Sequence, residues 1–147
     1  MRPDIVMDSA SQQATIVLAA LVECRDKGRA LAQKLEAVPE AQAVTFEFDC
    51  YRNHSHHAFD SGSPYIFGWV VDVFIRDNAA IWWSLDVTWD NVKWIIEAKV
   101  EVPADPGPIT VKQFPERYAE TVNEFVRELE EAGTELLNSA DLIATQL

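Results

Sequence analysis

The sequence predicts an α+β fold: a four-stranded antiparallel β-meander packed on one face by a long N-terminal and a long C-terminal helix. Two observations favour this fold. Residues 65–102 form three apolar, Trp-rich runs that alternate between an apolar and a more polar side, which is typical of strands with one buried face. Apolar residues at 14–38 and 118–147 instead recur every three or four positions, as in amphipathic helices. We expect residues 1–147 to form a single domain.

The N-terminal helix is expected to begin near Ser9 or Ser11, because either hydroxyl can cap free backbone N–H groups. Residues 1–8 would form a loose tail, and Pro39 would end the helix. Glycine in a helix costs about 1 kcal/mol relative to alanine, so Gly28 predicts the close approach of another element. The apolar seam is heptad-like and consists of Ala14, Val17, Leu21, Cys24, Gly28, Leu31, Leu35 and Val38.

The turn residues set the expected register of the meander, whose strands are predicted at 43–51, 65–76, 80–89 and 92–102. A two-residue turn at Asp90-Asn91 would pair Trp89 with Val92. A three-residue turn after Arg76 would pair it with Ala80. The inner face then receives the apolar rows Phe67–Trp89–Val92, Trp69–Val87–Trp94, Val71–Leu85–Ile96, Val73–Trp83–Ala98 and Ile75–Ile81–Val100.

The opposite face of the sheet is mixed in character and is a candidate contact surface. Phe74 and Trp82 are expected beside Lys99, and exposed aromatic clusters commonly mark protein interfaces. The alternative is that a terminal helix or the loop at 52–64 covers this face. Three carboxylates lie in its middle, and we interpret them as solvated acids without a catalytic role: Asp72, Asp86 and Glu97.

The C-terminal helix is expected to begin near Pro115, a good residue for a first turn, and to extend about 50 Å if unbroken. Its polar side would carry a ladder of acids that could dock a basic protein. The alternative is a solvated face, neutralised in part by Arg25, Lys27, Arg29 and Lys34 of the first helix. The ladder consists of Glu116, Glu120, Glu124, Glu128, Glu131 and Glu135.

Charge and composition narrow the classes of function. The formal net charge is −12, and an acidic surface repels nucleic acid and anionic membranes, so neither is expected as a partner. The apolar run 15–22 continues as a helical pattern past position 24, which favours a folded helix over a signal peptide and predicts a cytoplasmic protein.

The sequence gives little support for a metal or cofactor. His54, His56 and His57 are the candidate metal ligands, but no second Cys/His pair completes a tetrahedral set, so a polar loop is favoured and no cofactor is expected. Cys24 and Cys50 both occupy predicted core positions and are interpreted as buried thiols.

In size, acidity, α+β character and acidic ladder, the chain resembles the immunity proteins of bacterial toxin systems, which cover the active site of a basic toxin domain. That resemblance implies a non-enzymatic protein-binding module with a basic partner protein. The chain is also similar to secretion chaperones, which are dimeric, although its second helix follows all the strands. A small ligand-binding or enzymatic domain and a homodimer built through the long helices or the mixed face remain alternatives.

Overall fold

The computed structural model describes residues 3–50, 65–76, 79–104 and 106–142. The elements, in chain order, are α1 (Pro3–Glu36), β1 (Ala43–Cys50), β2 (Tyr65–Arg76), β3 (Ala79–Trp89), β4 (Trp94–Val102), β5 (Ile109–Gln113), β6 (Arg117–Ala119) and α3 (Val122–Leu137).

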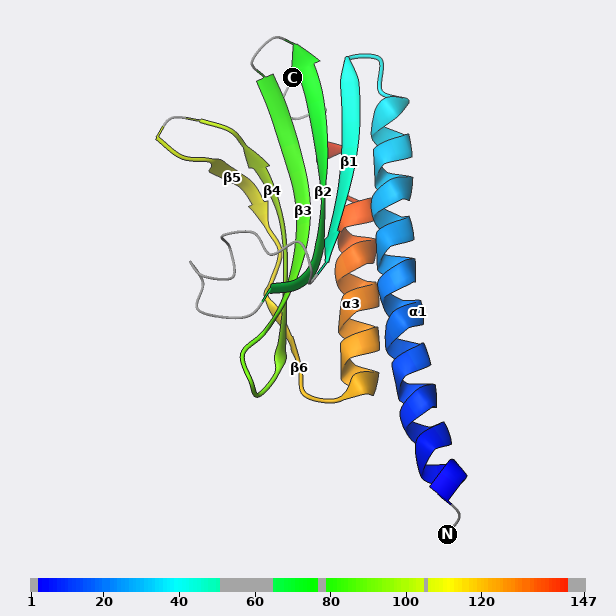
Figure 1. Cartoon of the computed structure of the whole chain (residues 1–147). Coiled ribbons are helices and arrows are strands. Elements are labelled where there is room, and N and C mark those ends of the chain that lie inside the picture. Colours follow the sequence, from blue (N-terminus) through cyan, green and yellow to red (C-terminus); the bar gives the residue numbers. More distant parts are fainter. Residues whose placement is uncertain (1–2, 51–64, 77–78, 105, 143–147) are drawn as a thin grey trace.

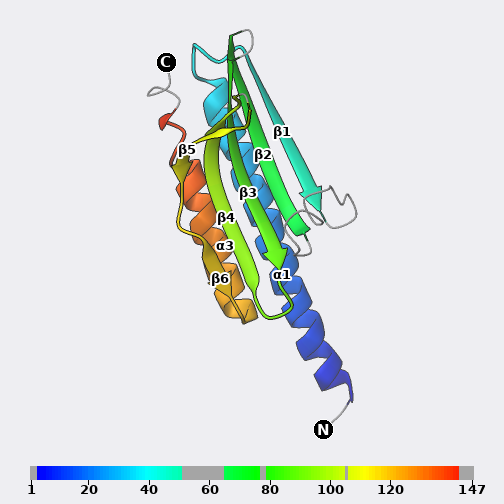
Figure 2. The same cartoon turned by 90° about the vertical axis from the view of Figure 1, so that its left-hand side faces the viewer.

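The two helices lie side by side on one face of an antiparallel sheet (Figures 1 and 2). Within the described residues the sheet has six strands in the order β1-β2-β3-β4-β5, and β6 pairs with β4 on the same side as β5. The α+β class and the antiparallel sheet are therefore confirmed. The predicted strand count was too low because β5 and β6 continue the sheet beyond β4. Strand β5 lies between the last predicted strand and the predicted helix, and β6 lies where that helix was expected to begin.

The predicted division of the sheet into two faces is confirmed. Trp83 is fully buried between sheet and helices, whereas Trp82 lies on the opposite face and is partly exposed. The helices cover a continuous apolar layer, which consists of Phe67, Trp69, Val71, Val73, Ile81, Trp83, Leu85, Val87, Ile96, Ala98 and Val100.

The predicted register was wrong by two residues in both hairpins. Trp69 lies opposite Leu85, where Val87 was expected, and Trp83 lies opposite Val100, where Ala98 was expected. Because side chains alternate with a period of two, a two-residue shift leaves every side chain on its predicted face. The pairs of residues across neighbouring strands therefore differ from the prediction, whereas the face on which each strand side chain lies does not.

A longer turn explains the shift between β3 and β4. Trp89 pairs with Trp94, so the loop contains four residues, 90–93. The Asp90 carboxylate accepts hydrogen bonds from the backbone N–H groups of Val92 (3.0 Å) and Lys93 (2.8 Å), and Asn91 has φ 75°. An aspartate side chain that closes the turn in this way stabilises a longer loop than the predicted two-residue turn. The other turn, Asp77-Asn78, lies outside the described residues, and Arg76 pairs with Ala79.

The C-terminal helix starts later and is shorter than predicted. It begins after Thr121, whose hydroxyl accepts a hydrogen bond from the Glu124 N–H (3.2 Å), and not near Pro115. Its 16 residues correspond to about 24 Å, half the predicted length. It continues through Gly133 without a break. Its buried side matches the predicted stripe at Phe125, Leu129, Ala132 and Leu136.

Helix α1 starts earlier than predicted, with Pro3 in its first turn, so Ser9 and Ser11 lie inside it and do not cap it. The predicted seam is buried from Cys24 to Leu35. Trp69 Nε1 donates a hydrogen bond to the Cys24 sulfur (3.4 Å), and burial raises the pKa of this thiol to about 11. Cys24 is therefore a buried thiol, as predicted, whereas the Cys50 side chain lies outside the described residues.

Candidate partner-binding surfaces

The six glutamates predicted to form one helical ladder lie on different elements. Glu116 precedes β6 and Glu120 precedes α3, so neither belongs to the helix. The other four, Glu124, Glu128, Glu131 and Glu135, do lie on α3. The ladder therefore starts at Glu124.

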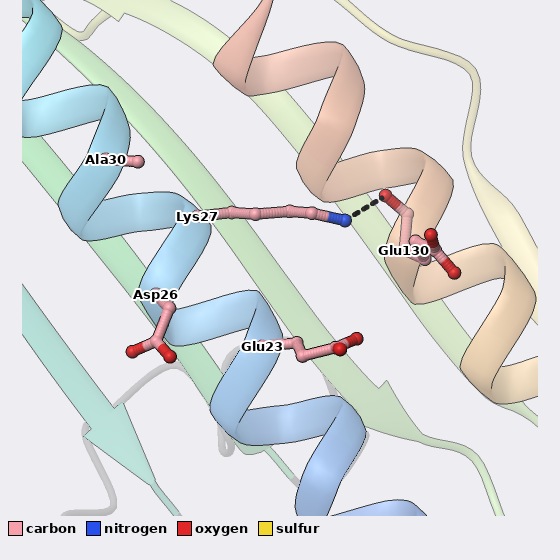
Figure 3. A pocket seen from close by; sticks show the side chains of 5 residues that line it. All are labelled: Glu23, Asp26, Lys27, Ala30 and Glu130. Atoms are coloured by element: carbon pink, nitrogen blue, oxygen red, sulfur yellow. Dashed lines mark hydrogen bonds between the residues drawn. The ribbon is translucent and has the colours of Figure 1, made fainter.

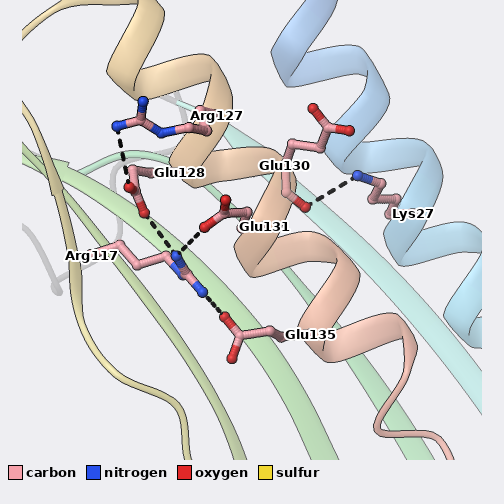
Figure 4. Close-up of polar contacts among 7 residues, drawn as sticks. All are labelled: Lys27, Arg117, Arg127, Glu128, Glu130, Glu131 and Glu135. Carbon is pink, nitrogen blue, oxygen red and sulfur yellow. Dashed lines mark hydrogen bonds and ion pairs between the residues drawn. The ribbon is translucent and has the colours of Figure 1, made fainter.

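Arg117 pairs with the last three glutamates of the remaining ladder (Figure 4). Its Nη1 donates to Glu128 (2.8 Å) and Glu131 (2.7 Å), and its Nη2 donates to Glu135. Strand β6 aims this side chain at α3, because Arg117 pairs with Ile96, a residue of the buried face of β4. Burial by itself would lower the pKa of Arg117, but its hydrogen bonds with Glu135 and Glu128 more than offset this effect and raise it.

The first helix does not supply the predicted neutralisation through Lys27. Its Nζ donates to the backbone carbonyl oxygen of Glu130 (3.2 Å), across a shallow groove between the helices (Figure 3). The carbons of the Lys27 side chain pack over Gly133 of α3. Lys27 therefore joins the two helices and leaves the Glu130 carboxylate exposed. The groove is lined by Glu23, Asp26, Lys27, Ala30 and Glu130.

The outer face of the sheet, which points away from both helices, carries the other predicted site residues (Figure 1). The corrected register separates the predicted aromatic and cationic cluster. Trp82 lies between Asp72 and Glu101, and Lys99 lies opposite Ser84 and forms an ion pair with Glu101 (3.7 Å). Phe74 lies opposite Ala80 near the end of the hairpin and is 40% exposed.

Three acids meet on the outer face near the β4 edge. Asp86 lies opposite Glu97, where the predicted register had Ile95, and the carboxyl groups of Glu97 and Glu116 lie close enough to share a proton. Burial, and then the charge of Glu116, raise the pKa of Glu97; the opposing effect of Lys99 is smaller. The Tyr118 hydroxyl donates to Glu116 (2.6 Å), and this bond raises the pKa of Tyr118. We call these four residues, Asp86, Glu97, Glu116 and Tyr118, the outer acidic cluster.

A second half-buried acid on this face behaves in the same way. Burial, followed by the charge of Glu47, raises the pKa of Asp72, against the effect of a hydrogen bond with Thr45. Carboxylates with raised pKa values are charged at neutral pH only at a cost in free energy. A cation placed on the outer face would remove part of that cost. This face is therefore better suited to a basic ligand than the ladder, which already contacts Arg117.

Replacing Glu97 with glutamine is expected to stabilise the protein near neutral pH by about 0.2–1 kcal/mol, the range for one cross-strand pair. The folded state binds the Glu97 proton more tightly than the unfolded state because the pKa is raised. The protonated Glu97 side chain therefore adds to the stability of the folded state at acid pH. This added stability is lost as the pH rises through the raised pKa of Glu97. Urea unfolding at two pH values would measure the gain, which should disappear on acidification. Glu40→Gln, at an exposed position after α1, is the matched control.

The role of Arg117 and the hydrogen bond between Tyr118 and Glu116 could not be predicted from the sequence. A three-residue strand is too short to show periodicity. The stretch Ile109–Gln113 does begin with Ile-Thr-Val, a strand-favouring run that could have indicated β5.

The described residues contain no group of three or more His, Cys, Asp or Glu side chains arranged to hold a metal ion. The candidates His54, His56 and His57 lie outside those residues. Within the described parts of both helices, no stretch has the length and apolar character needed to cross a membrane.

Comparisons of the chain with protein-family models, with curated proteins and with solved structures find no match. The resemblance to immunity proteins therefore stays a prediction.

Proposed function

We propose that the chain is a non-enzymatic binding protein that uses the outer face of its sheet to bind a basic partner protein, in the manner of a toxin-neutralising immunity protein. The observation that carries the proposal is the outer acidic cluster, in which Asp86 lies opposite Glu97 and the carboxyl groups of Glu97 and Glu116 lie close enough to share a proton, on a face without helices. The net charge of −12 supports the same class of partner, because oppositely charged surfaces steer association and raise its rate.

The outer face of the sheet is energetically a better site for a basic partner than the helical ladder. Binding to Glu128 or Glu135 would have to compete with Arg117, which already contacts both. An arginine or lysine of a partner at the outer acidic cluster would instead pair with carboxylates whose charge is unfavourable in the free protein. The half-exposed rings of Trp82 and Tyr118 would add apolar contact beside the charges, as is common at the centre of protein interfaces.

Three charge-reversed variants, each changing the net charge by the same amount, would test the proposal. Glu97→Lys with Glu116→Lys alters the outer face. Glu23→Lys with Glu130→Lys alters the groove between the helices. Glu120→Lys with Glu124→Lys alters the first residue of the ladder, Glu124, and the acid that precedes the helix. Circular dichroism would first establish that each variant folds.

The partner would be purified by affinity from cells of the source organism, identified by mass spectrometry, and titrated against each variant by calorimetry. We expect a basic protein whose affinity falls at least about tenfold, or 1.4 kcal/mol, with the outer-face variant and changes little with the groove variant. Loss of affinity with the ladder variant alone would assign binding to the helix. An equal loss of affinity with all three variants would mean that binding depends only on the net charge of the protein. Either of these two results would refute the proposal.

A further inference from the structure

The N-terminal end of α1 projects beyond the sheet and beyond the start of α3 (Figures 1 and 2). The segment of α1 that follows, residues 11–22, carries large apolar side chains in contact with water: Leu18 is 62% exposed, and Ile16 and Val22 are each 44% exposed. Most of the stability of a helix in a protein comes from the packing of its apolar side against another element. Residues 11–22 of α1 therefore present an apolar side that the described part of the chain does not cover.

The exposed residues follow a helical repeat. Ser11, Thr15, Leu18 and Val22 are spaced by four, three and four residues, so they form one stripe along α1. This spacing is the one with which two helices pack against each other along their length. Ile16 lies outside the stripe, beside Val122 at the start of α3.

The charges on this stripe change sign along the helix. Residues 9–22 contain no charged side chain, although the whole chain carries a net charge of −12. The same repeat continues toward the N-terminus with aspartates at positions 4 and 8. Toward the C-terminus it continues with Arg25 and Arg29. The stripe is therefore acidic at one end, uncharged in the middle and basic at the other.

We propose that this stripe, residues 4–29 of α1, binds the same stripe of a second copy of the chain in antiparallel orientation. A two-fold axis between Thr15 and Leu18 places Thr15 against Leu18 of the second copy, and Ser11 against Val22. The same axis brings position 8 next to Arg25 and position 4 next to Arg29. Each acidic end meets a basic end, so two acidic chains can associate without repulsion at the contact.

The position of the two arginines fits this arrangement. The guanidinium of Arg25 lies 5.9 Å from the ring centre of Phe48, and that of Arg29 lies 5.9 Å from the ring centre of Phe46. Both rings belong to β1, the edge strand of the sheet. A second α1 would therefore pack on the β1 side of the first, away from α3. The overlap of about 26 residues would be about 39 Å long. The outer face of each sheet lies away from this contact, so this proposal does not depend on the proposed function.

Light scattering coupled to size exclusion would test the contact on the full chain over a series of concentrations. We expect a species of twice 16.6 kDa. Leu18→Glu with Val22→Glu should raise its dissociation constant at least about 100-fold, because two apolar contacts become buried charges. Val92→Glu with Ile109→Glu is the matched control, since these residues are 63% and 61% exposed and lie far from α1. A wild-type monomer at every concentration, or a dimer that survives the Leu18 and Val22 changes in a folded protein, would overturn the proposal.

Charge exchange would test the antiparallel register. Asp4→Arg places two bases together in the dimer, and Arg29→Asp places two acids together, so each variant alone should dimerise more weakly than the wild type. An equimolar mixture of the two should form a heterodimer, because each Arg at position 4 or 29 then faces an Asp. Native mass spectrometry would distinguish the species. If the mixture dimerised no better than the separate variants, the antiparallel pairing would be wrong. If the dimer were lost only with Glu97→Lys and Glu116→Lys, the contact between the two copies would lie on the outer face of the sheet.

Discussion

Replacing Gly28 with alanine is expected to destabilise the protein by about 1–3 kcal/mol, the usual cost of overpacking a core. An added Cβ would lie 2.6 Å from Cε1 of Phe46 and 2.8 Å from Cδ2 of Trp69. The Trp69 ring cannot easily yield, because it is 1% exposed and donates a hydrogen bond to Cys24. The steric cost therefore exceeds the gain of about 1 kcal/mol that alanine brings to a helix. Urea unfolding followed by circular dichroism would measure the change.

Gly133 of α3 provides the matched control. A Cβ there would lie 3.0 Å from Cδ of Lys27, a flexible side chain that can move aside. Gly133→Ala should therefore be neutral or stabilise the protein by up to about 1 kcal/mol. Both glycines are buried within helices, so the two sites differ in how closely the neighbour approaches and in how easily it can move. The same sign of change in the two variants would contradict this account of the helix contacts.

The sequence predicted which side chains lie on each face of the sheet, but not which residues pair across neighbouring strands. Alternation assigns Trp83 to the core and Trp82 to the reverse side, whatever the turn. The rows depend on the length of each turn, and Asp90 changed that length by accepting two backbone hydrogen bonds. The outer-face residues were therefore predicted on the correct face, but with some wrong neighbours, such as Trp82 beside Lys99. The shift between β3 and β4 also placed Glu97 opposite Asp86, where the predicted register had Ile95.

The predicted start of the C-terminal helix was too early because a residue of strand β6 happens to fall at a helical spacing from the apolar residues of α3. Tyr118, Val122 and Phe125 have helical spacing, yet Tyr118 belongs to strand β6. The sequence did contain a better signal. Thr121 and Glu124 have the spacing of a capping box, in which the hydroxyl of the first residue accepts from the backbone N–H of the fourth.

The partners of the acidic ladder could not be read from the sequence at all. Arg117 reaches α3 only because β6 pairs with β4, a contact between segments about 20 residues apart that depends on the three-dimensional path of the chain. The helical arginines and lysines were the nearest candidates by pattern. The structure directs Arg25 and Arg29 toward β1, away from α3.

Replacing Arg117 with leucine is expected to destabilise the protein by about 2–3 kcal/mol near neutral pH. The substitution leaves Glu128, Glu131 and Glu135 close together without the cation that now contacts all three. Removing one partner of a fully buried ion pair costs about 3–5 kcal/mol. The expected cost is smaller because Arg117 is 20% exposed and Glu131 is 52% exposed, so water screens part of the repulsion. Urea unfolding would give the free-energy difference.

The conservative variant and the pH dependence separate charge from packing. Arg117→Lys keeps the charge but cannot donate to three carboxylates through a planar fork, so we expect it to lose about 1 kcal/mol. Because the pKa of Arg117 is raised, the guanidinium stays charged at every accessible pH, and acid acts on the carboxylates alone. The deficit of Arg117→Leu should therefore shrink as the medium is made acidic enough to protonate them. A deficit that stayed constant with pH would mean that Arg117 stabilises the fold through the packing of its aliphatic chain.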